Sequence, residues 1–534
     1  MIARIGTGVA GLFELAVALP AFFRQTVTLE RAHDGITRAL ADRDERFLRL
    51  VQSRIYRVPQ SPYLRLLRIA GCEFSDLETS VRRDGIEATL HKLAVAGVYL
   101  DAGEFKGKRE VVRGATSFRV SPSEFDPQDR SSGIVTQSTG SSNRPIASIA
   151  TLERLAIWAL YQCIFYDAHG LFLSSHAVYD AAVPAGAGIR TILNRTKAGI
   201  PMDKWFAREV PTPDGFVKYS SAMTSFVVVA LAKLFGPGAA LPETVHHEDL
   251  TPIVDWFTRT RAQGRACCLK TSSSNAVRVA QAAARAGISL AGMTFHVGGE
   301  PFTESKHAVL QRAGASAVTD YAFEGGGLTG VGCANPAYLD EVHLLHPHMV
   351  AIRRPHPIIL GDSSVYPLLC TTLHSGYGSL LFNVENGDYG VLESRDCGCA
   401  LERVGLKFHL HHIRSYEKFT SEGMNYSYGD LYEFVERTLP SEFGGSIGDY
   451  QIAEEEDEAG QTRLTLRVDP KLGAIDEGKL LARLRAELGR GAWNNEFQAR
   501  EWAKAGTLRV RREAPVASAR GKILPLEMQK KSAS

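Results

Sequence analysis

Hydrophobic positions recur at helical spacing over the first part of the chain. The repeating positions are Phe47, Leu48, Leu50, Val51 and Ile55, followed by Leu64, Leu66, Leu67 and Ile69. Apolar residues three and four positions apart share one face of a helix, so this spacing is typical of helices packed against a core. The pattern predicts several helices between about residues 24 and 110.

Helical and strand-like stretches alternate between about residues 150 and 300. Residues 152–165 and 275–286 have the helical period, whereas residues 291–297 form a short apolar run that ends in Gly-Gly-Glu-Pro. Residues 226–231 are apolar throughout and fit either a strand or a buried helix. Alternation of this kind predicts an α/β body whose sheets are at least partly parallel.

Strand-like runs separated by turn residues dominate after about residue 340, at 349–352, 379–384 and 390–393. From about residue 418 a smaller unit begins, with predicted helices at 428–439 and 477–488 and strands at 450–455, 463–468 and 507–511. The predicted fold class is therefore α/β: a large, multi-layer N-terminal domain with mixed sheets, followed by a small, mobile α+β domain. The predicted parts are a helical part at 1–110, a core at 111–416 and a C-terminal domain at 417–534.

The N-terminal stretch 6–23 is largely apolar and follows Arg4. Glu14 interrupts the stretch, and no small-residue cleavage site follows Phe22, Phe23 and Arg24, which disfavours a signal peptide. We expect a helix docked on the body of the protein; a signal peptide and a helix lying on a membrane surface remain the alternatives. No segment reaches the 18 apolar residues of a membrane span.

Composition narrows the classes of partner. Lys and Arg total 61 against 59 Asp and Glu, and a net charge of +2 gives no basis for electrostatic binding of nucleic acid. Eight cysteines in 534 residues are too few for a disulfide scaffold, which favours a reducing, cytoplasmic compartment.

A hydroxyl- and glycine-rich loop is the first chemical signal. Its residues are Ser138, Thr139, Gly140, Ser141, Ser142, Asn143, Arg144 and Pro145. Backbone N–H groups, hydroxyls and the arginine could donate to a polyphosphate, although the Lys of a P-loop is missing. The segment resembles the phosphate loop of the adenylate-forming enzymes, the acyl- and aryl-CoA synthetase superfamily. It departs from their pattern at Asn143, where glycine is usual.

Later segments resemble further motifs of that superfamily, in the same order. The resemblance implies that Gly299, Glu300 and Pro301 wall the adenine, that Tyr321 stacks on it, and that Glu324 holds Mg²⁺ near the phosphates. The spacing from Tyr321 to Glu324 is one residue short. Either Asp320 replaces the aromatic residue, or the loop is shortened, or Glu324 is displaced.

The resemblance extends to the end of the chain. It implies that Asp388 accepts hydrogen bonds from the ribose hydroxyls and that Arg414 contacts ribose or phosphate, although Ile413 replaces the usual glycine. Glu417 would be the hinge between the two domains. Lys522, beside Gly521 on the small domain, would meet the charge that develops during adenylation.

Cys333, His343, Cys397 and Cys399 supply four ligands of the kinds that structural Zn²⁺ prefers. The glycine between the last two cysteines permits the bend that lets both thiolates chelate one ion. A similar arrangement occurs in the phenylacetate–CoA ligase-like branch, which this chain resembles most.

The resemblance implies a ligase that uses ATP and Mg²⁺ to convert a carboxylic acid, an aryl or fatty acid in the first instance, into acyl-AMP and pyrophosphate. Coenzyme A would then take the acyl group as a thioester. One alternative is transfer to a carrier-protein or protein thiol. Another is a non-catalytic, nucleotide-binding scaffold, which the departures at Asn143, Tyr321–Glu324 and Ile413 would favour.

Overall fold

The computed structural model describes most of the chain. The described residues are 2–125, 133–137, 147–181, 186–208, 215–246, 248–323, 325–360, 363–377, 379–427, 431–490, 493–517 and 523–527.

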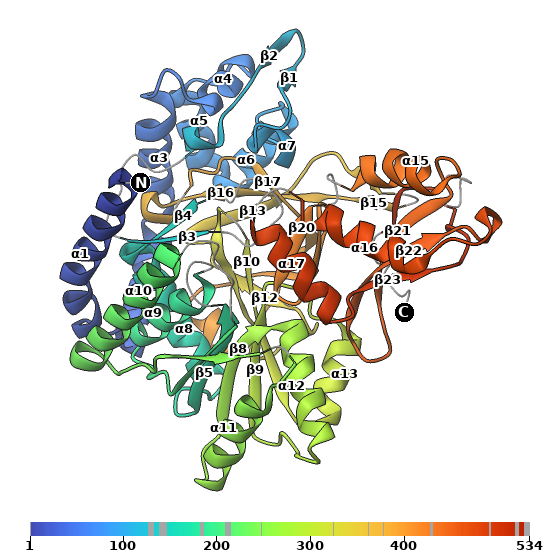
Figure 1. Ribbon diagram of the computed structural model, residues 1–534. Helices are drawn as coiled ribbons and strands as arrows, with labels where there is room; N and C mark the ends of the chain where they lie inside the picture. The colour runs from blue at the N-terminus through green and yellow to red at the C-terminus, as the bar shows by residue number, and fades with distance from the viewer. Residues whose placement is uncertain are drawn as a thin grey trace.

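Helices make up most of the first hundred residues, as predicted (Figure 1). They are α1 (Ile2–Arg24), α2 (Leu29–Ala41), α3 (Arg43–Val51), the π-helix η1 (Gln52–Tyr56), α4 (Pro62–Ile69), α5 (Phe74–Asp84), α6 (Ile86–Val95) and α7 (Ala102–Phe105). Hairpins β1 (Val111–Arg113)–β2 (Thr116–Phe118) and β3 (Gly133–Gln137)–β4 (Ala147–Thr151) follow. The periodic positions Phe47, Leu48, Leu64 and Leu67 are buried, which confirms the helical assignment.

Helix α1 packs against α10 (Gly215–Phe235) at one edge of the molecule (Figure 1). Leu19 and Phe23 are fully buried, and the Arg24 guanidinium lies 4.4 Å from the Phe235 ring centroid. The expectation of a docked N-terminal helix is confirmed. Among the described residues no single helix meets the length and hydropathy of a membrane span; one pair, Leu12–Arg24 with Leu29–Ala41, meets them together but is bent by 107°.

A twelve-stranded sheet forms the centre of the large part, in the order β13-β16-β17-β18-β12-β11-β10-β9-β8-β5-β6-β7. The strands from β10 to β7 run parallel. This half contains β5 (Ser175–Ala181), β6 (Lys204–Arg208), β7 (Pro242–Val245), β8 (Cys267–Ser272), β9 (Met293–Gly298) and β10 (Ser316–Phe323). Its helices are α8 (Leu152–Ala168), α9 (Ala187–Lys197), α10, α11 (Thr251–Ala262), α12 (Ser273–Arg285) and α13 (Glu304–Arg312).

Both faces of the parallel half are covered, which explains its continuous apolar strands. Successive side chains of a strand point to opposite faces. Accordingly, Cys267 and Leu269 of β8 join the core that includes α11 and α12, whereas Cys268 between them joins the core that includes α8 and α9. The predicted α/β body with parallel strands is confirmed. Residues 226–231 lie inside α10, so the helical alternative for this run is correct.

The second half of the sheet is antiparallel. It contains β11 (Gly327–Gly332), β12 (Val342–Leu344), β13 (Met349–Arg353), β16 (Pro367–Thr372), β17 (Val384–Ser394) and β18 (Phe408–Ser415), with the hairpin β14 (Ile358–Leu360)–β15 (Ser363–Val365) and the short helix α14 (Ala400–Arg403) beside it. The prediction of a strand over 379–384 is wrong, because β17 begins only at Val384. Asn383 has a left-handed φ of 51°, and its amide donates to the carbonyl oxygens of Leu90 and Val98. These hydrogen bonds hold the segment against the α6 region, where a strand would instead pair with a neighbouring strand.

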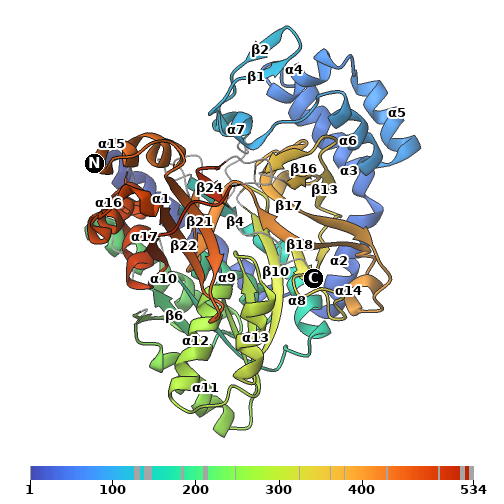
Figure 2. The same cartoon turned by 90° about the vertical axis from the view of Figure 1, so that its right-hand side faces the viewer.

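The C-terminal part has its own hydrophobic core, built from residues between Phe419 and Leu526. It begins with the hairpin β19 (Lys418–Ser421)–β20 (Met424–Ser427), and its four-stranded sheet has the order β23-β22-β21-β24. Its elements are the π-helix η5 (Phe434–Thr438), α15 (Leu439–Phe443), β21 (Tyr450–Glu456), β22 (Thr462–Val468), α16 (Glu477–Leu488), α17 (Trp493–Lys504), β23 (Leu508–Arg511) and β24 (Leu526–Glu527). Helix α17 was not predicted. Figure 2 shows this orange-to-red part beside the helices of the parallel half.

Two histidines have lowered pKa values: His346, buried in the turn between β12 and β13, and His374, half-buried just after β16. Burial, together with Arg43 nearby, lowers the pKa of His346 to about 4, and burial beside Arg46 lowers the pKa of His374 to about 4. The unfolded chain binds protons at these rings below pH 6.5, whereas the folded chain binds them only near pH 4. Stability contributed by the neutral rings is therefore complete above pH 6.5 and is lost as the pH falls toward 4.

We expect each of these two rings to lower the free energy of unfolding by about 2 kcal/mol between pH 7.5 and pH 5.0. Urea unfolding at both pH values measures the loss. In His374→Asn, whose amide oxygen can still accept the N–H of Gly376 that His374 accepts, the loss should shrink by about 2 kcal/mol. His33→Asn, on the exposed face of α2, should leave the loss unchanged. An equal loss in His374→Asn and wild type would contradict the assignment.

Candidate functional site

Several of the residues predicted from motif resemblance lie outside the described part of the chain. These are the phosphate-loop residues Ser138, Thr139, Gly140, Ser141, Ser142 and Arg144, with Glu324 and Lys522. Their roles stay predictions. The other predicted site residues, from Gly299 to Arg414, all have described positions.

The described residues of the nucleotide prediction gather at one edge of the sheet. Gly299, Glu300 and Pro301 follow the carboxyl end of β9, and Tyr321 lies near the carboxyl end of the neighbouring strand β10. In the sheet, β6 and β7 follow β5 on one side, whereas β8 and β9 follow on its other side. The strand order therefore reverses between β5 and β8. Ligands of open α/β sheets bind beyond the carboxyl ends of strands near such a point, so this edge is the candidate active site.

Tyr321 and Asp388 are in direct contact although 67 positions separate them. The Tyr321 hydroxyl donates to Asp388 Oδ2 at 2.8 Å, and Asn386 Nδ2 donates to the same hydroxyl oxygen at 2.6 Å. Burial, followed by the charge of Asp388, raises the pKa of Tyr321 well above its usual value, so the hydroxyl keeps its proton. Sequence reasoning missed Asn386, whose one signal was its place beside the Gly-Asp turn.

Arg414 lies on β18 opposite Tyr389 of β17, one position along from the pair formed by Ser415 and Asp388. Arg414 Nη1 lies 3.2 Å from Asp340 Oδ2. The structure thus brings Tyr321, Asp388 and the segment of Arg414 to one region.

Asp320 does not take the place of the aromatic residue, because its carboxylate is occupied elsewhere. Lys270 Nζ and His296 Nε2 lie 2.6 Å and 2.9 Å from Asp320 Oδ2. A Cβ atom on Gly298 would lie 1.9 Å from Asp320 Oδ1, so only glycine leaves room for this charged group at the start of the Gly-Gly-Glu-Pro segment. Burial is opposed here by the charge of Lys270, which keeps the pKa of Asp320 well below its usual range.

Glu300 links the large part to the C-terminal part. Its Oε2 accepts from the backbone N–H of Ser274 at 2.7 Å and from the Ser274 hydroxyl at 2.6 Å. Its Oε1 accepts from the N–H of Gly423, at the tip of the β19–β20 hairpin. In this arrangement of the two parts, the Glu300 carboxylate contacts these groups, and its predicted role beside adenine stays untested.

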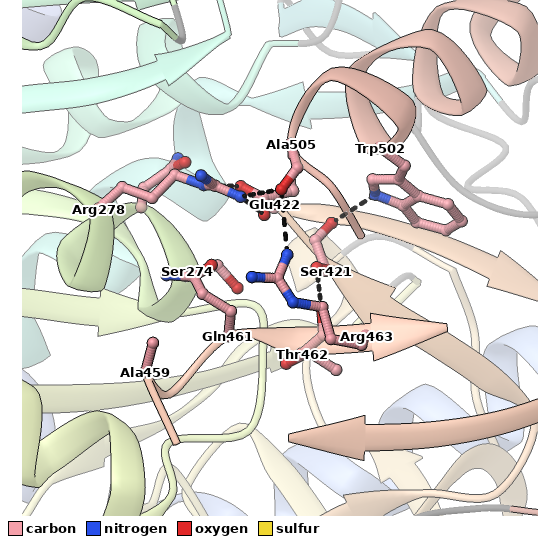
Figure 3. Close-up of polar contacts among 12 residues, drawn as sticks. Ser274, Arg278, Ser421, Glu422, Ala459, Gln461, Thr462, Arg463, Trp502 and Ala505 are labelled. Atoms are coloured by element: carbon pink, nitrogen blue, oxygen red, sulfur yellow. Dashed lines mark hydrogen bonds and ion pairs between the residues drawn. The ribbon is translucent and has the colours of Figure 1, made fainter. Parts of the chain in front are cut away.

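The residue next to Gly423 makes a buried ion pair between the two parts (Figure 3). Arg278 Nε donates to Glu422 Oε2 at 2.7 Å, and the same guanidinium donates to the Ala505 carbonyl at 3.1 Å. The Glu422 side chain is 1% exposed, and its φ of 56° is left-handed. Sequence reasoning missed both residues, since they lie 144 positions apart and belong to no motif that we noted.

The four predicted zinc ligands come together. The ligand atoms of Cys333, His343, Cys397 and Cys399 all lie within 4.8 Å of one another. The Sγ atoms of Cys397 and Cys399 lie 3.6 Å and 3.2 Å from His343 Nε2. Gly398 between them has a φ of 72°, the left-handed conformation that the predicted bend requires.

This donor set fits Zn²⁺. With bonds of about 2.3 Å to sulfur and 2.0 Å to nitrogen, a tetrahedral ion separates these ligand atoms by about 3.5 Å. The Nδ1 of His343 lies 2.7 Å from the Leu406 carbonyl, which accepts its proton and leaves Nε2 free to bind metal. Arg395 Nη2 lies 3.6 Å from Cys333 Sγ and can offset the single negative charge that three thiolates would leave beside one Zn²⁺.

A second group, Cys333, Glu341 and His409, fits a metal poorly. The Glu341 carboxylate already accepts from Arg395 and from the backbone N–H groups of Ala337 and Tyr338. A guanidinium beside the group would repel a cation. We therefore regard Glu341 as part of the support around the four-ligand cluster.

No family model matches the chain, and no curated protein matches it by sequence. Among solved structures, a 2-hydroxyisobutyryl-CoA ligase in complex with 2-HIB-AMP and CoA is similar, with a TM-score of 0.50 and 14% identity over 95% of this chain and 92% of that one. The amide bond synthetase McbA from Marinactinospora thermotolerans has a TM-score of 0.39 and 13% identity over 96% and 98%. The o-succinylbenzoate CoA synthetase MenE from Bacillus subtilis has a TM-score of 0.39 and 11% identity over 73% and 68%.

The likeness to the first structure extends over nearly the full length of both chains, whereas TM-scores below 0.5 do not by themselves indicate a shared fold. The prediction of a large mixed α/β part followed by a small α+β part is confirmed. The chain therefore has the two-part fold of that CoA ligase.

Proposed function

We propose that the protein is an adenylate-forming acid–thiol ligase. It would bind ATP and a carboxylic acid at the carboxyl edge of the sheet, form acyl-AMP, and pass the acyl group to a thiol. The observation that carries the proposal is the meeting of Tyr321, Asp388 and the Arg414 segment within this fold. A fold likeness to a ligase that holds an acyl-AMP and CoA supports it.

The reaction needs positioning and charge stabilisation more than covalent chemistry. A carboxylate oxygen attacks the α-phosphorus of ATP in line, the bond from that phosphorus to the bridging oxygen breaks, and pyrophosphate leaves with the electron pair. A thiolate then attacks the acyl carbonyl and AMP departs. Asp388, with two acceptor oxygens, suits a ribose that has two hydroxyl donors.

Mg²⁺, when bound, would neutralise phosphate charge, and Glu324 is the residue that we propose holds it. The loop from Ser138 to Arg144 would donate to the phosphates. Glu417, whose carboxylate lies 2.9 Å from Lys106 Nζ, would be the pivot of the small part. Coenzyme A is the proposed acceptor and an aryl or fatty acid the proposed substrate, on the resemblance to phenylacetate–CoA ligases.

Carboxylate-dependent exchange of label between pyrophosphate and ATP, across a library of acids, tests the proposal. Exchange with any acid, followed by a thioester only when coenzyme A is present, is the expected result. If exchange occurs but the acyl group passes only to a protein thiol, the adenylation step is supported and coenzyme A is rejected as the acceptor. Binding of ATP without exchange for any acid would favour a non-catalytic scaffold.

Lys522→Ala is expected to slow adenylation by roughly 10²–10³-fold, because a positioned cation that meets developing charge supplies about 3–4 kcal/mol. Pyrophosphate exchange measures the effect. Lys479→Ala is the matched control, since Lys479 is 78% exposed on α16 of the same part and should have no effect. Equal exchange rates in the two variants would remove Lys522 from the mechanism.

A further inference from the structure

The loop between two of the proposed zinc ligands reaches toward the candidate active site. Residues 333–343, here called the metal loop, begin at Cys333 and end at His343. Arg395 donates to the Asn335 carbonyl, and Asn335 Nδ2 donates to the Cys397 carbonyl, both at about 3 Å. The loop is therefore fastened at its ends and along its length to the cysteine–histidine cluster.

Asp340, near the end of the metal loop, binds the backbone of β18. Its Oδ1 accepts from the N–H of His412 at 2.9 Å, and its Oδ2 accepts from the N–H of Ile413 at 2.8 Å. The same Oδ2 lies 3.2 Å from Arg414 Nη1. One carboxylate thus holds three successive residues, and the Tyr338 ring stacks on His411 just before them, with centroids 3.9 Å apart.

These residues form a bulge in which one residue has an uncommon backbone conformation. The register of β17 and β18 shifts between Tyr389, which faces Arg414, and Val391, which faces His411. His412 and Ile413 therefore oppose Gly390 alone, and His412 has a φ of 54°, unusual for a residue with a side chain. Bulges re-aim side chains, and strained backbone persists only where neighbouring groups hold it.

We propose that Asp340 is a positioning residue: it transmits the geometry of the metal cluster to the β18 bulge and so fixes where Arg414 points. The proposal rests on the proposed function only for the step from Arg414 to the nucleotide. Ile413 stands where the resemblance places a glycine, and the residue of this segment with left-handed backbone is His412, one position earlier.

Hydrogen–deuterium exchange of zinc-loaded protein, resolved to the amides of His412 and Ile413, tests the positioning step without any substrate. In Asp340→Ala we expect both amides to exchange about tenfold faster or more, since each loses a charged acceptor, while elemental analysis still finds one zinc per chain. Asp340→Asn, which keeps an acceptor oxygen, should exchange at an intermediate rate and covers the case in which the alanine variant fails to fold.

Asp249→Ala is the matched control, because Asp249 likewise accepts a backbone N–H, that of Thr251, far from β18 in sequence. It should leave His412 and Ile413 at the wild-type rate. Wild-type exchange rates in zinc-loaded Asp340→Ala would overturn the proposal. Loss of zinc in both Asp340 variants would overturn it as well, because Asp340 would then act on the metal and not on the bulge.

Binding of ATP, measured by calorimetry, tests the functional step. Zinc-loaded Asp340→Ala should bind ATP about tenfold more weakly than wild type, with Asp249→Ala unchanged. Wild-type affinity in Asp340→Ala would overturn the link to the nucleotide. Absence of ATP binding by wild-type protein contradicts the proposed function instead, and the exchange rates of His412 and Ile413 then decide the positioning role by themselves.

Discussion

Replacing Cys397 with serine is expected to leave the protein without zinc. A serine hydroxyl binds Zn²⁺ much more weakly than a thiolate does. A structural zinc site uses four protein ligands, so the loss of one ligand weakens zinc binding strongly. The hydrogen bond from Cys333 and the neighbouring His343 lower the pKa of Cys399, whereas the hydrogen bond with Cys399, followed by burial, raises the pKa of Cys333. Structural zinc contributes on the order of 10 kcal/mol to folding.

Elemental analysis of purified Cys397→Ser measures the metal, and thermal unfolding with and without a chelator measures the stability. Wild-type protein should lose stability on chelation, and the variant should be insensitive to the chelator. Cys72→Ser is the control, because Cys72 is half-buried and lies outside the cluster. Unchanged zinc in Cys397→Ser would reject the ligand set.

Replacing Arg278 with methionine is expected to separate the C-terminal part from the large part. The substitution removes the guanidinium that pairs with the buried Glu422 carboxylate, and breaking a buried ion pair costs about 3–5 kcal/mol. Withdrawal of the hairpin tip into water relieves that cost more cheaply than unfolding does, because Ser421, Glu422 and Gly423 can leave together. We therefore expect domain separation with both cores intact.

Single-molecule energy transfer between dyes on α12 and α16 measures the separation, and limited proteolysis near the hairpin provides a second readout. Arg278→Met combined with Glu422→Met removes both charges and should restore the docked arrangement. Arg259→Met on the exposed face of α11 is the control. A docked arrangement in the single variant Arg278→Met would show that the pair contributes little to docking.

Local sequence predicted the elements of this protein well where one period dominates. Residues 477–488 form α16 within the predicted bounds, since Asp476 caps its first turn and Leu480 and Leu484 lie on one buried face. Prediction failed where distant contacts decide. The run at 379–384 has strand-forming residues, but Asn383 bonds the α6 region almost 300 positions earlier and takes a left-handed conformation.

For the candidate site, too, local sequence predicted some features and distant contacts decided others. The sequence by itself determined the residue types of the cysteine–histidine cluster and the order of the motifs that resemble nucleotide-binding segments, because residue chemistry and short spacings are local properties. Only the tertiary structure decided that Tyr321 donates to Asp388, that Arg278 pairs with Glu422, and that Asp340 holds the bulge before Arg414. Each of these contacts joins segments more than 65 positions apart, and sheet order and burial, which no local period encodes, bring such segments together.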